Sequence, residues 1–213
     1  MNIVILLYPN FTALDAIGPY EMLAHVPGNK VTFAAKEKGL VTADSGVLSI
    51  QATHALAEIE ACDMLLIPGG GGEFAVRDDA PVINWVRKIH ETTRFTTSVC
   101  TGAMLLAKAG ILDGLSATTH WAAEKWLPEY GATYKAERWV EEGKIITAAG
   151  VSAGIDMALY IISKVQGVDV AKTVQLATEY DPQPPFDSGS VAKADPKAIA
   201  GLSKMFDTSR NIT

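Results

Sequence analysis

The stretch Phe95-Thr-Thr-Ser-Val-Cys100-Thr-Gly-Ala-Met-Leu-Leu-Ala-Lys-Ala-Gly110 joins a predicted strand directly to a predicted helix. Residues 95–99 are β-prone, and the helix formers that follow Cys100 end at Gly110. Such a junction holds one side chain on a sharp turn at the carboxyl edge of a sheet, as a nucleophile elbow does. We therefore expect Cys100 to be a catalytic nucleophile, with a thiol that ionises more easily because it lies at a helix N-terminus. The alternative is a buried core cysteine.

Buried strands and helices alternate along the rest of the chain. Continuous apolar runs at 3–8 and 62–67 are typical of strands that are buried on both faces of a parallel sheet. Apolar residues at helical spacing occupy 16–25, 81–91 and 155–165. This order predicts an α/β fold with a flavodoxin-like, doubly wound, mostly parallel sheet and helices on both faces.

Length, composition and charge narrow the class of protein. The chain has 213 residues, of which 48% are hydrophobic and 20% charged, which is typical of a globular protein. We expect a single domain over 1–213, with a core over about 1–190 and a C-terminal extension over 191–213. The net charge of −6 gives no basic patch for nucleic acid or a membrane surface. The first residues lack a signal peptide pattern, so we expect a cytoplasmic location.

The cysteines and histidines do not follow metal-site spacing. Cys62 and Cys100 form neither a disulfide framework nor a zinc motif, and the four histidines make no paired pattern. The sequence therefore predicts no metal and no cofactor. Cys62 begins a predicted strand instead of a helix, and we interpret it as a core residue.

Two further segments end at the same predicted sheet edge as Cys100. Asp15 follows the first strand near a helix start, where the alternative to a chemical role is an N-cap or helix-dipole role. The glycine run at 69–72 lacks the spacing of phosphate-binding loops. The N–H groups of Gly70 and Gly71 suit an oxyanion hole, and a flexible turn is the alternative.

His120 is the histidine that lies nearest a predicted strand end. It closes a short predicted strand at 117–121, ahead of a predicted helix at 122–127. We expect it to contact substrate, although a structural histidine at the sheet edge is the alternative. Ligands in doubly wound sheets bind beyond the strand carboxyl ends, so these segments predict one site.

The chain resembles the DJ-1/PfpI superfamily over residues 1 to about 190. The resemblance is carried by Leu14-Asp-Ala-Ile-Gly-Pro-Tyr-Glu21, Ile67-Pro-Gly-Gly-Gly71, Ser98-Val-Cys-Thr-Gly102 and Ala117-Thr-Thr-His-Trp121. Peptidase-like members carry a histidine directly after the cysteine, and members with glutamate at the first acidic position have aspartate here. Both departures count against peptidase or generic deglycase activity.

Within the superfamily, the Asp15, Cys100 and Thr101 pattern is similar to that of the isonitrile hydratases, and residues 179–186 resemble their C-terminal segment. The resemblance implies hydration of isonitriles to N-substituted formamides through a cysteine-bound thioimidate. It implies that Asp15 supplies the proton, that Thr101 donates a hydrogen bond, and that the chain is a homodimer. Asp181 is a candidate for a supporting carboxylate.

Two alternative functions remain consistent with the sequence. One is a DJ-1-like stress-response protein whose Cys100 is oxidised and which has no dedicated substrate. The other is a ligand-binding domain related to those of AraC-type regulators. Those regulators also carry a helix-turn-helix module, and we expect this chain to be too short to include one. Fold alone does not separate these functions.

Overall fold

The computed structural model describes residues 1–210, with side chains described through Thr208. In this part of the chain, seven strands form the central sheet in the order β10-β11-β7-β6-β1-β2-β5. Neighbouring strands are parallel except β10, which is antiparallel to β11. The strands are β1 (Asn2–Leu6), β2 (Lys30–Ala35), β5 (His54–Ala55), β6 (Met64–Ile67), β7 (Phe95–Val99), β10 (Trp139–Glu142) and β11 (Ile145–Ala148).

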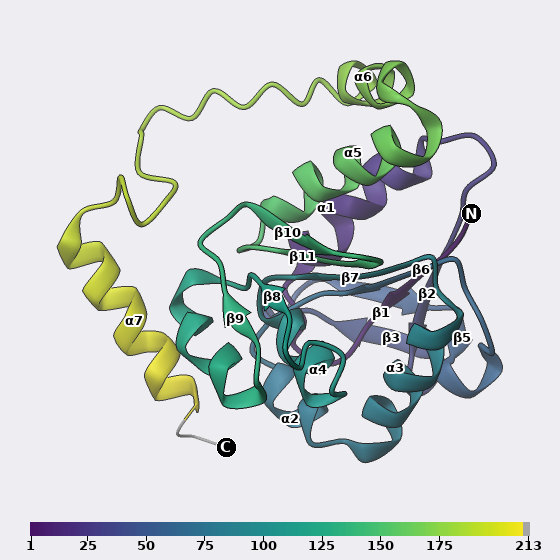
Figure 1. Cartoon of the computed structure of the whole chain (residues 1–213), viewed down its shortest axis with the longest axis horizontal. Helices are drawn as coiled ribbons and strands as arrows, with labels where there is room; N and C mark the ends of the chain where they lie inside the picture. Colours follow the sequence, from purple (N-terminus) through teal and green to yellow (C-terminus); the bar gives the residue numbers. More distant parts are fainter. Residues whose placement is uncertain (211–213) are drawn as a thin grey trace.

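Helices cover both faces of the sheet (Figure 1). On one face lie α1 (Ala13–Ala24) and α5 (Ala153–Gln166), with α6 (Val168–Ala177) packed against α5. On the other face lie α2 (Glu73–Arg77), α3 (Ala80–Thr92) and α4 (Ala103–Lys108). The predicted flavodoxin-like α/β fold is confirmed. The strands β1, β6 and β7 are buried between the two helical layers, which explains why they are apolar or small along almost their whole length.

Two glycines let α1 and α5 approach each other closely. A Cβ at Gly18 would lie 2.9 Å from Ile155 Cγ1, and a Cβ at Gly154 would lie 2.8 Å from Pro19 Cγ. The same Cβ at Gly154 would lie 2.9 Å from Val99 Cγ2, at the end of β7. Because α1 and α5 follow strands β1 and β11, this contact fixes the loops at the carboxyl edge of the sheet.

The smaller elements agree with the sequence in part. Two short strands, β3 (Gly39–Thr42) and β4 (Ser49–Ala52), form an antiparallel pair outside the main sheet. The short 3-10 turn η1 (Leu56–Glu58) follows β5. The prediction of a strand at 117–121 was too long, because only β8 (Ser116–Ala117) is extended, where it pairs with β9 (Thr133–Tyr134). The helix predicted at 122–127 is the 3-10 helix η3 (Trp121–Tyr130), which contains Pro128. Proline cannot donate a backbone hydrogen bond, so an α-helix is disfavoured there.

The C-terminal part of the chain leaves the core and returns to it. We call residues 178–195 the C-terminal arm; it runs from α6 across to α7 (Pro196–Arg210), the yellow helix at the left of Figure 1. Prolines at 182, 184 and 185 keep the arm out of helix and sheet. Helix α7 packs against η3, and Lys125 Nζ contacts Asp207 Oδ1 at 2.5 Å. Within residues 1–210, no helix has the length and apolar character that crossing a bilayer requires.

Candidate active site

Cys100 lies on a strained turn between β7 and the 3-10 turn η2 (Cys100–Gly102). Its φ angle of 57° falls in the left-handed region that non-glycine residues rarely adopt. Two hydrogen bonds hold this turn: Cys100 N–H donates to the Ala149 carbonyl at 2.9 Å, and the Cys100 carbonyl accepts from Thr119 Oγ1 at 2.9 Å. The side chain is buried, and it lines a cavity at the carboxyl edge of the sheet. This is the elbow geometry that the sequence predicted.

Asp15 is a fully buried carboxyl in the first turn of α1, beside the thiol of Cys100. Its Oδ2 atom accepts a 2.8 Å hydrogen bond from Gly69 N–H. Burial raises its pKa to about 7, against the lowering effect of the Gly69 N–H and of the Cys100 thiol, and the charge of Asp44 adds to the increase. Asp15 therefore holds a proton in a large fraction of molecules at neutral pH.

The pKa of the Cys100 thiol is raised well above its usual value. Burial is the main cause and the negative charge of Asp15 the second, while the N–H groups of Thr101 and Val151 lower the pKa. The prediction that the elbow makes this thiol easier to ionise is therefore wrong. The helical segment behind the thiol is short and its effect is smaller than the desolvation cost. Asp15 and Cys100 form a coupled pair that favours one negative charge over two.

The glycine loop after β6 packs directly against the elbow. A Cβ at Gly69 would lie 2.6 Å from Thr101 Oγ1 and 3.0 Å from Cys100 Cβ, so a larger residue does not fit there. Gly70 has a φ of 131°, and its N–H donates to Thr101 Oγ1 at 3.1 Å. Gly70 and Gly71 both line the cavity. Both glycines thus line the same cavity as Cys100, and the Gly70 N–H is held by Thr101.

The cavity that contains Cys100 has a volume of about 220 Å³ and a largely apolar wall. Asp44 and Thr12 form its polar rim, with Thr12 Oγ1 donating to Asp44 Oδ2 at 2.7 Å. Among the described residues, no group of three or more His, Cys, Asp or Glu side chains is arranged to hold a metal ion. The apolar wall comprises Phe74, His120, Trp126, Val151, Met205 and Phe206.

His120 reaches the cavity as a neutral ring. Burial lowers its pKa to about 4, and its Nδ1 accepts a 3.2 Å hydrogen bond from Ala122 N–H at the start of η3. The imidazole stacks on Phe206, with the ring centroids 4.6 Å apart and an interplanar angle of 8°. A Cβ at Gly150 would lie 2.6 Å from His120 Cδ2, so only glycine leaves room for the ring at this edge. His120 contributes an aromatic surface to the cavity and carries no charge at neutral pH.

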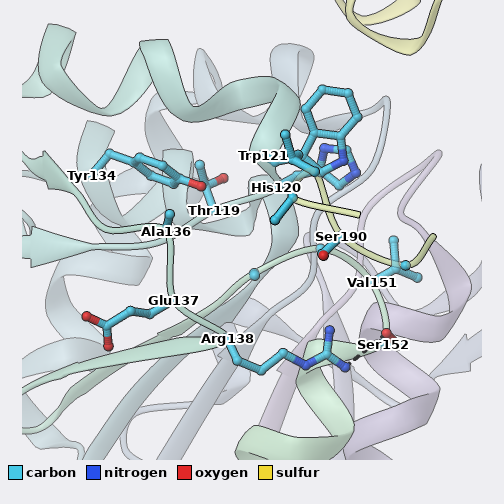
Figure 2. Close-up of a pocket in the computed structure, with 15 residues that line it drawn as sticks. Thr119, His120, Trp121, Tyr134, Ala136, Glu137, Arg138, Val151, Ser152 and Ser190 are labelled. Atoms are coloured by element: carbon cyan, nitrogen blue, oxygen red, sulfur yellow. Dashed lines mark hydrogen bonds between the residues drawn. The ribbon is translucent and has the colours of Figure 1, made fainter. Parts of the chain in front are cut away.

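A second cavity of about 460 Å³ lies on the other side of His120 (Figure 2). Figure 2 shows His120 and Trp121 next to each other, with Ser190 of the C-terminal arm nearby and Arg138 reaching toward Ser152. Arg138 also forms an ion pair with Asp156 at 2.5 Å. Residues 189–192 of the arm line part of this cavity, and His120 and Val151 line both this cavity and that of Cys100.

One predicted residue lies elsewhere, and several lining residues were not predicted. Asp181 is exposed on the C-terminal arm, where its Oδ2 accepts a hydrogen bond from Gln183 Nε2 at 3.0 Å, and it does not line the cavity of Cys100. The structure therefore gives Asp181 no contact with the site. Asp44, Met205 and Phe206 were missed because each follows a turn or an arm whose direction the local sequence does not specify.

Comparison with known proteins shows the family of this chain. A sequence profile of the DJ-1/PfpI family matches residues 1–164. An isonitrile hydratase of Pseudomonas putida is 40% identical over 199 residues, which are 93% of this chain and 86% of that protein. The HTH-type transcriptional regulator CdhR of Pseudomonas aeruginosa is 28% identical over 82% of this chain and 53% of its own length. The crystal structure of a ThiJ/PfpI family protein from Pseudomonas syringae matches with a TM-score of 0.95 at 32% identity, over 99% of this chain and 87% of its own. This chain belongs to the DJ-1/PfpI family.

Proposed function

We propose that this protein hydrates isonitriles to N-substituted formamides, with Cys100 as the nucleophile. The observation that carries the proposal is the buried Asp15–Cys100 pair beside an apolar cavity, with the Asp15 pKa at about 7. The reaction needs a sulfur nucleophile and a group that gives up a proton and takes it back, and this pair supplies both. The 40% identity to an isonitrile hydratase supports the same activity.

The first step forms a bond between sulfur and the isonitrile carbon. The Cys100 thiol passes its proton to the Asp15 carboxylate, the resulting thiolate attacks that carbon, and the protonated Asp15 then transfers the proton to the same carbon. The product is a neutral thioimidate on Cys100, in which carbon is bonded to sulfur, hydrogen and nitrogen, and Asp15 is left as a carboxylate. The pair has one negative charge before and after this step, so the buried site never holds two.

The second step adds water and releases the product. Asp15 takes a proton from water as the hydroxyl adds to the thioimidate carbon, and this proton passes to nitrogen. The carbon–sulfur bond then breaks as the hydroxyl loses its proton to Asp15, which restores the thiolate and the protonated carboxyl. The formamide leaves. The Gly71 N–H and the hydroxyl of Thr101, which the Gly70 N–H orients, are proposed to stabilise the negative charge that develops on nitrogen and oxygen.

The test is direct conversion of a simple isonitrile. Purified protein is mixed with phenyl isonitrile, and N-phenylformamide is measured by chromatography. We expect the formamide from wild type and none from Cys100→Ala. Cys62→Ala is the matched control, because Cys62 is a buried thiol outside the cavity whose pKa burial raises to about 12. This control should keep wild-type activity.

The outcomes separate the proposal from its rivals. Turnover that persists in Cys100→Ala would refute the nucleophile. Absence of formamide from wild type with several isonitriles would refute the activity. Mass spectrometry of the Cys100 peptide after peroxide would then test the stress-response alternative, in which the cysteine is oxidised.

A second candidate function is ligand binding without chemistry. The similarity to a transcriptional regulator over 82% of this chain favours it. It predicts that a small molecule binds in the cavity with an affinity that survives Cys100→Ser. Calorimetry with a phenyl formamide, which has the shape of the proposed product, distinguishes the two when combined with the turnover assay.

We also propose that the chain forms a homodimer. Helix α6 exposes Val168 and Leu176, which are 57% and 78% exposed. A contiguous exposed apolar surface is typical of protein–protein interfaces, and we propose that these two side chains belong to one. Sedimentation velocity tests the proposal, and Leu176→Glu should shift the population toward monomer. A monomeric wild type at micromolar concentration would refute it.

A further inference from the structure

Two residues of the cavity wall come from outside the part of the chain that the family profile matches. That match ends at residue 164, whereas Met205 and Phe206 lie on α7. Asp15, Cys100 and Thr101 all lie within the matched residues. The reacting groups therefore belong to the shared fold, while part of the surface around the substrate comes from an extension.

The contacts of α7 place Phe206 firmly against the site. Its ring stacks on His120, and the next residue, Asp207, forms an ion pair with Lys125 of η3. Gly150 packs against another edge of the His120 ring, where a Cβ would lie 2.6 Å from Cδ2. The ion pair is exposed and contributes little to stability by itself. The aromatic stack and the packing of Phe206 on the hydrophobic core therefore hold this wall beside the thiol.

The volume of the cavity limits what can lie between Cys100 and α7. An apolar cavity of about 150 Å³ is enough to bind benzene. The cavity here, at about 220 Å³, has room for one six-membered ring and the isonitrile group attached to it. Met205 and Phe206 form the wall that a wider substituent would meet. The lining of Phe74, Trp126 and Phe206 suits a flat apolar substituent.

We propose that Phe206, together with Met205, is a specificity-determining residue that limits the isonitrile substituent to about the size of a single ring. This inference rests on the proposed function. Phe206 does not touch the reacting atoms in this scheme; it sets the depth of the cavity. The chemical class of substrate that follows is an aryl or similarly compact apolar isonitrile.

The experiment compares phenyl isonitrile with 2-naphthyl isonitrile. We expect wild type to favour the phenyl substrate in kcat/KM, and Phe206→Ala to raise the naphthyl-to-phenyl ratio by about tenfold or more. The larger side chain of Phe206→Trp should take up part of the cavity that the phenyl ring needs, and it should therefore lower kcat/KM for the phenyl substrate. Lys204→Ala, on an exposed residue of the same helix, is the matched control and should leave the ratio unchanged.

A second readout does not depend on isonitrile turnover. Cys100 is alkylated with N-methylmaleimide and with N-(1-naphthyl)maleimide, and the rates are followed by mass spectrometry of the Cys100 peptide. Phe206→Ala should raise the relative rate of the larger reagent. Circular dichroism confirms that the variants fold, and Phe206→Leu provides a milder change if Phe206→Ala does not.

The two proposals fail in different ways. A wild type that forms no formamide refutes the hydratase activity, and the alkylation rates still decide whether Phe206 limits the cavity. If both the substrate ratio and the alkylation ratio are the same in wild type, Phe206→Ala and Phe206→Trp, the specificity role of Phe206 is refuted even though the enzyme is active.

Discussion

The backbone N–H of Gly69 donates a 2.8 Å hydrogen bond to Oδ2 of Asp15, across 54 residues of sequence. This bond ties the first turn of α1 to the loop after β6 and orients the carboxyl toward Cys100. A single backbone donor offsets only part of the cost of burying a charge, so the pKa of Asp15 stays raised, at about 7. The chemistry that we propose depends on this intermediate value.

The rate of hydration should depend on pH through the Asp15–Cys100 pair. The reactive pair carries one negative charge, and a second proton neutralises it as the pH falls through about 7. We expect kcat/KM to fall about tenfold for each pH unit below pH 7 and to level off above pH 8. Initial rates between pH 5 and pH 9 measure this. An unchanged rate across that range would contradict the role of the pair.

Asp15→Asn should change how stability depends on pH. The folded carboxyl keeps its proton up to pH values near 7, whereas an unfolded aspartate loses it near 3.8. Native protein thus binds more protons between these values, so the free energy of unfolding of wild type falls as pH rises. Between pH 5 and pH 8, we expect the free energy of unfolding of wild type to fall by about 3 kcal/mol more than that of Asp15→Asn.

Urea unfolding at the two pH values measures the difference between wild type and Asp15→Asn. Asp181→Asn is the matched control, because its side chain is exposed on the C-terminal arm. A stability difference between wild type and Asp15→Asn that is the same at pH 5 and pH 8 would show that the carboxyl is not perturbed by burial.

Thr101→Val should weaken the site by leaving the Gly70 N–H without its acceptor. Thr101 Oγ1 accepts that hydrogen bond at 3.1 Å. Removing one partner of a partly buried hydrogen bond costs about 1–2 kcal/mol. We expect Thr101→Val to lose this amount of the free energy of unfolding and to have a lower kcat. Thr101→Ser keeps the hydroxyl, so its stability and kcat should be close to those of wild type. A loss in Thr101→Ser as large as that in Thr101→Val would contradict the role of the hydroxyl, because serine keeps it.

Gly102→Ala should destabilise the protein because the elbow touches the backbone of β6. A Cβ at Gly102 would lie 2.2 Å from the Ile67 carbonyl oxygen and 2.7 Å from that of Pro68. Backbone atoms cannot turn aside as a side chain can, so we expect a loss of at least about 2 kcal/mol. Gly201→Ala, which meets nothing within 4 Å on α7, is the control and should be neutral or slightly stabilising. Chemical denaturation compares the two.

Much of the fold follows from local sequence. The apolar runs that become β1 and β6 predict buried parallel strands because such strands have no polar face. Strand ends then predict which side chains meet, since the carboxyl ends of β1, β6 and β7 share one edge. Asp15, the glycine loop and Cys100 were found in this way.

The remainder of the site depends on contacts that local patterns do not encode. Asp44 reaches the cavity because Phe11 pairs with Ala43, a bridge between two loops. Phe206 arrives through an arm of 18 residues that has no regular structure to give its direction. The pKa of Cys100 was predicted with the wrong sign because burial is a property of the whole fold, whereas the helix terminus is visible in the sequence.

The long reach of the hydrogen bonds around Cys100 has a consequence for the newly made chain. The contacts from Gly69 to Asp15, from Gly70 to Thr101 and from Thr119 to Cys100 span 54, 31 and 19 residues. Contacts between distant residues form late, because the intervening chain must first be ordered. Until then the thiol is open to solvent and to oxidants. A reducing agent is therefore needed most while the protein is being synthesised or refolded, and least once the pocket has closed around the sulfur.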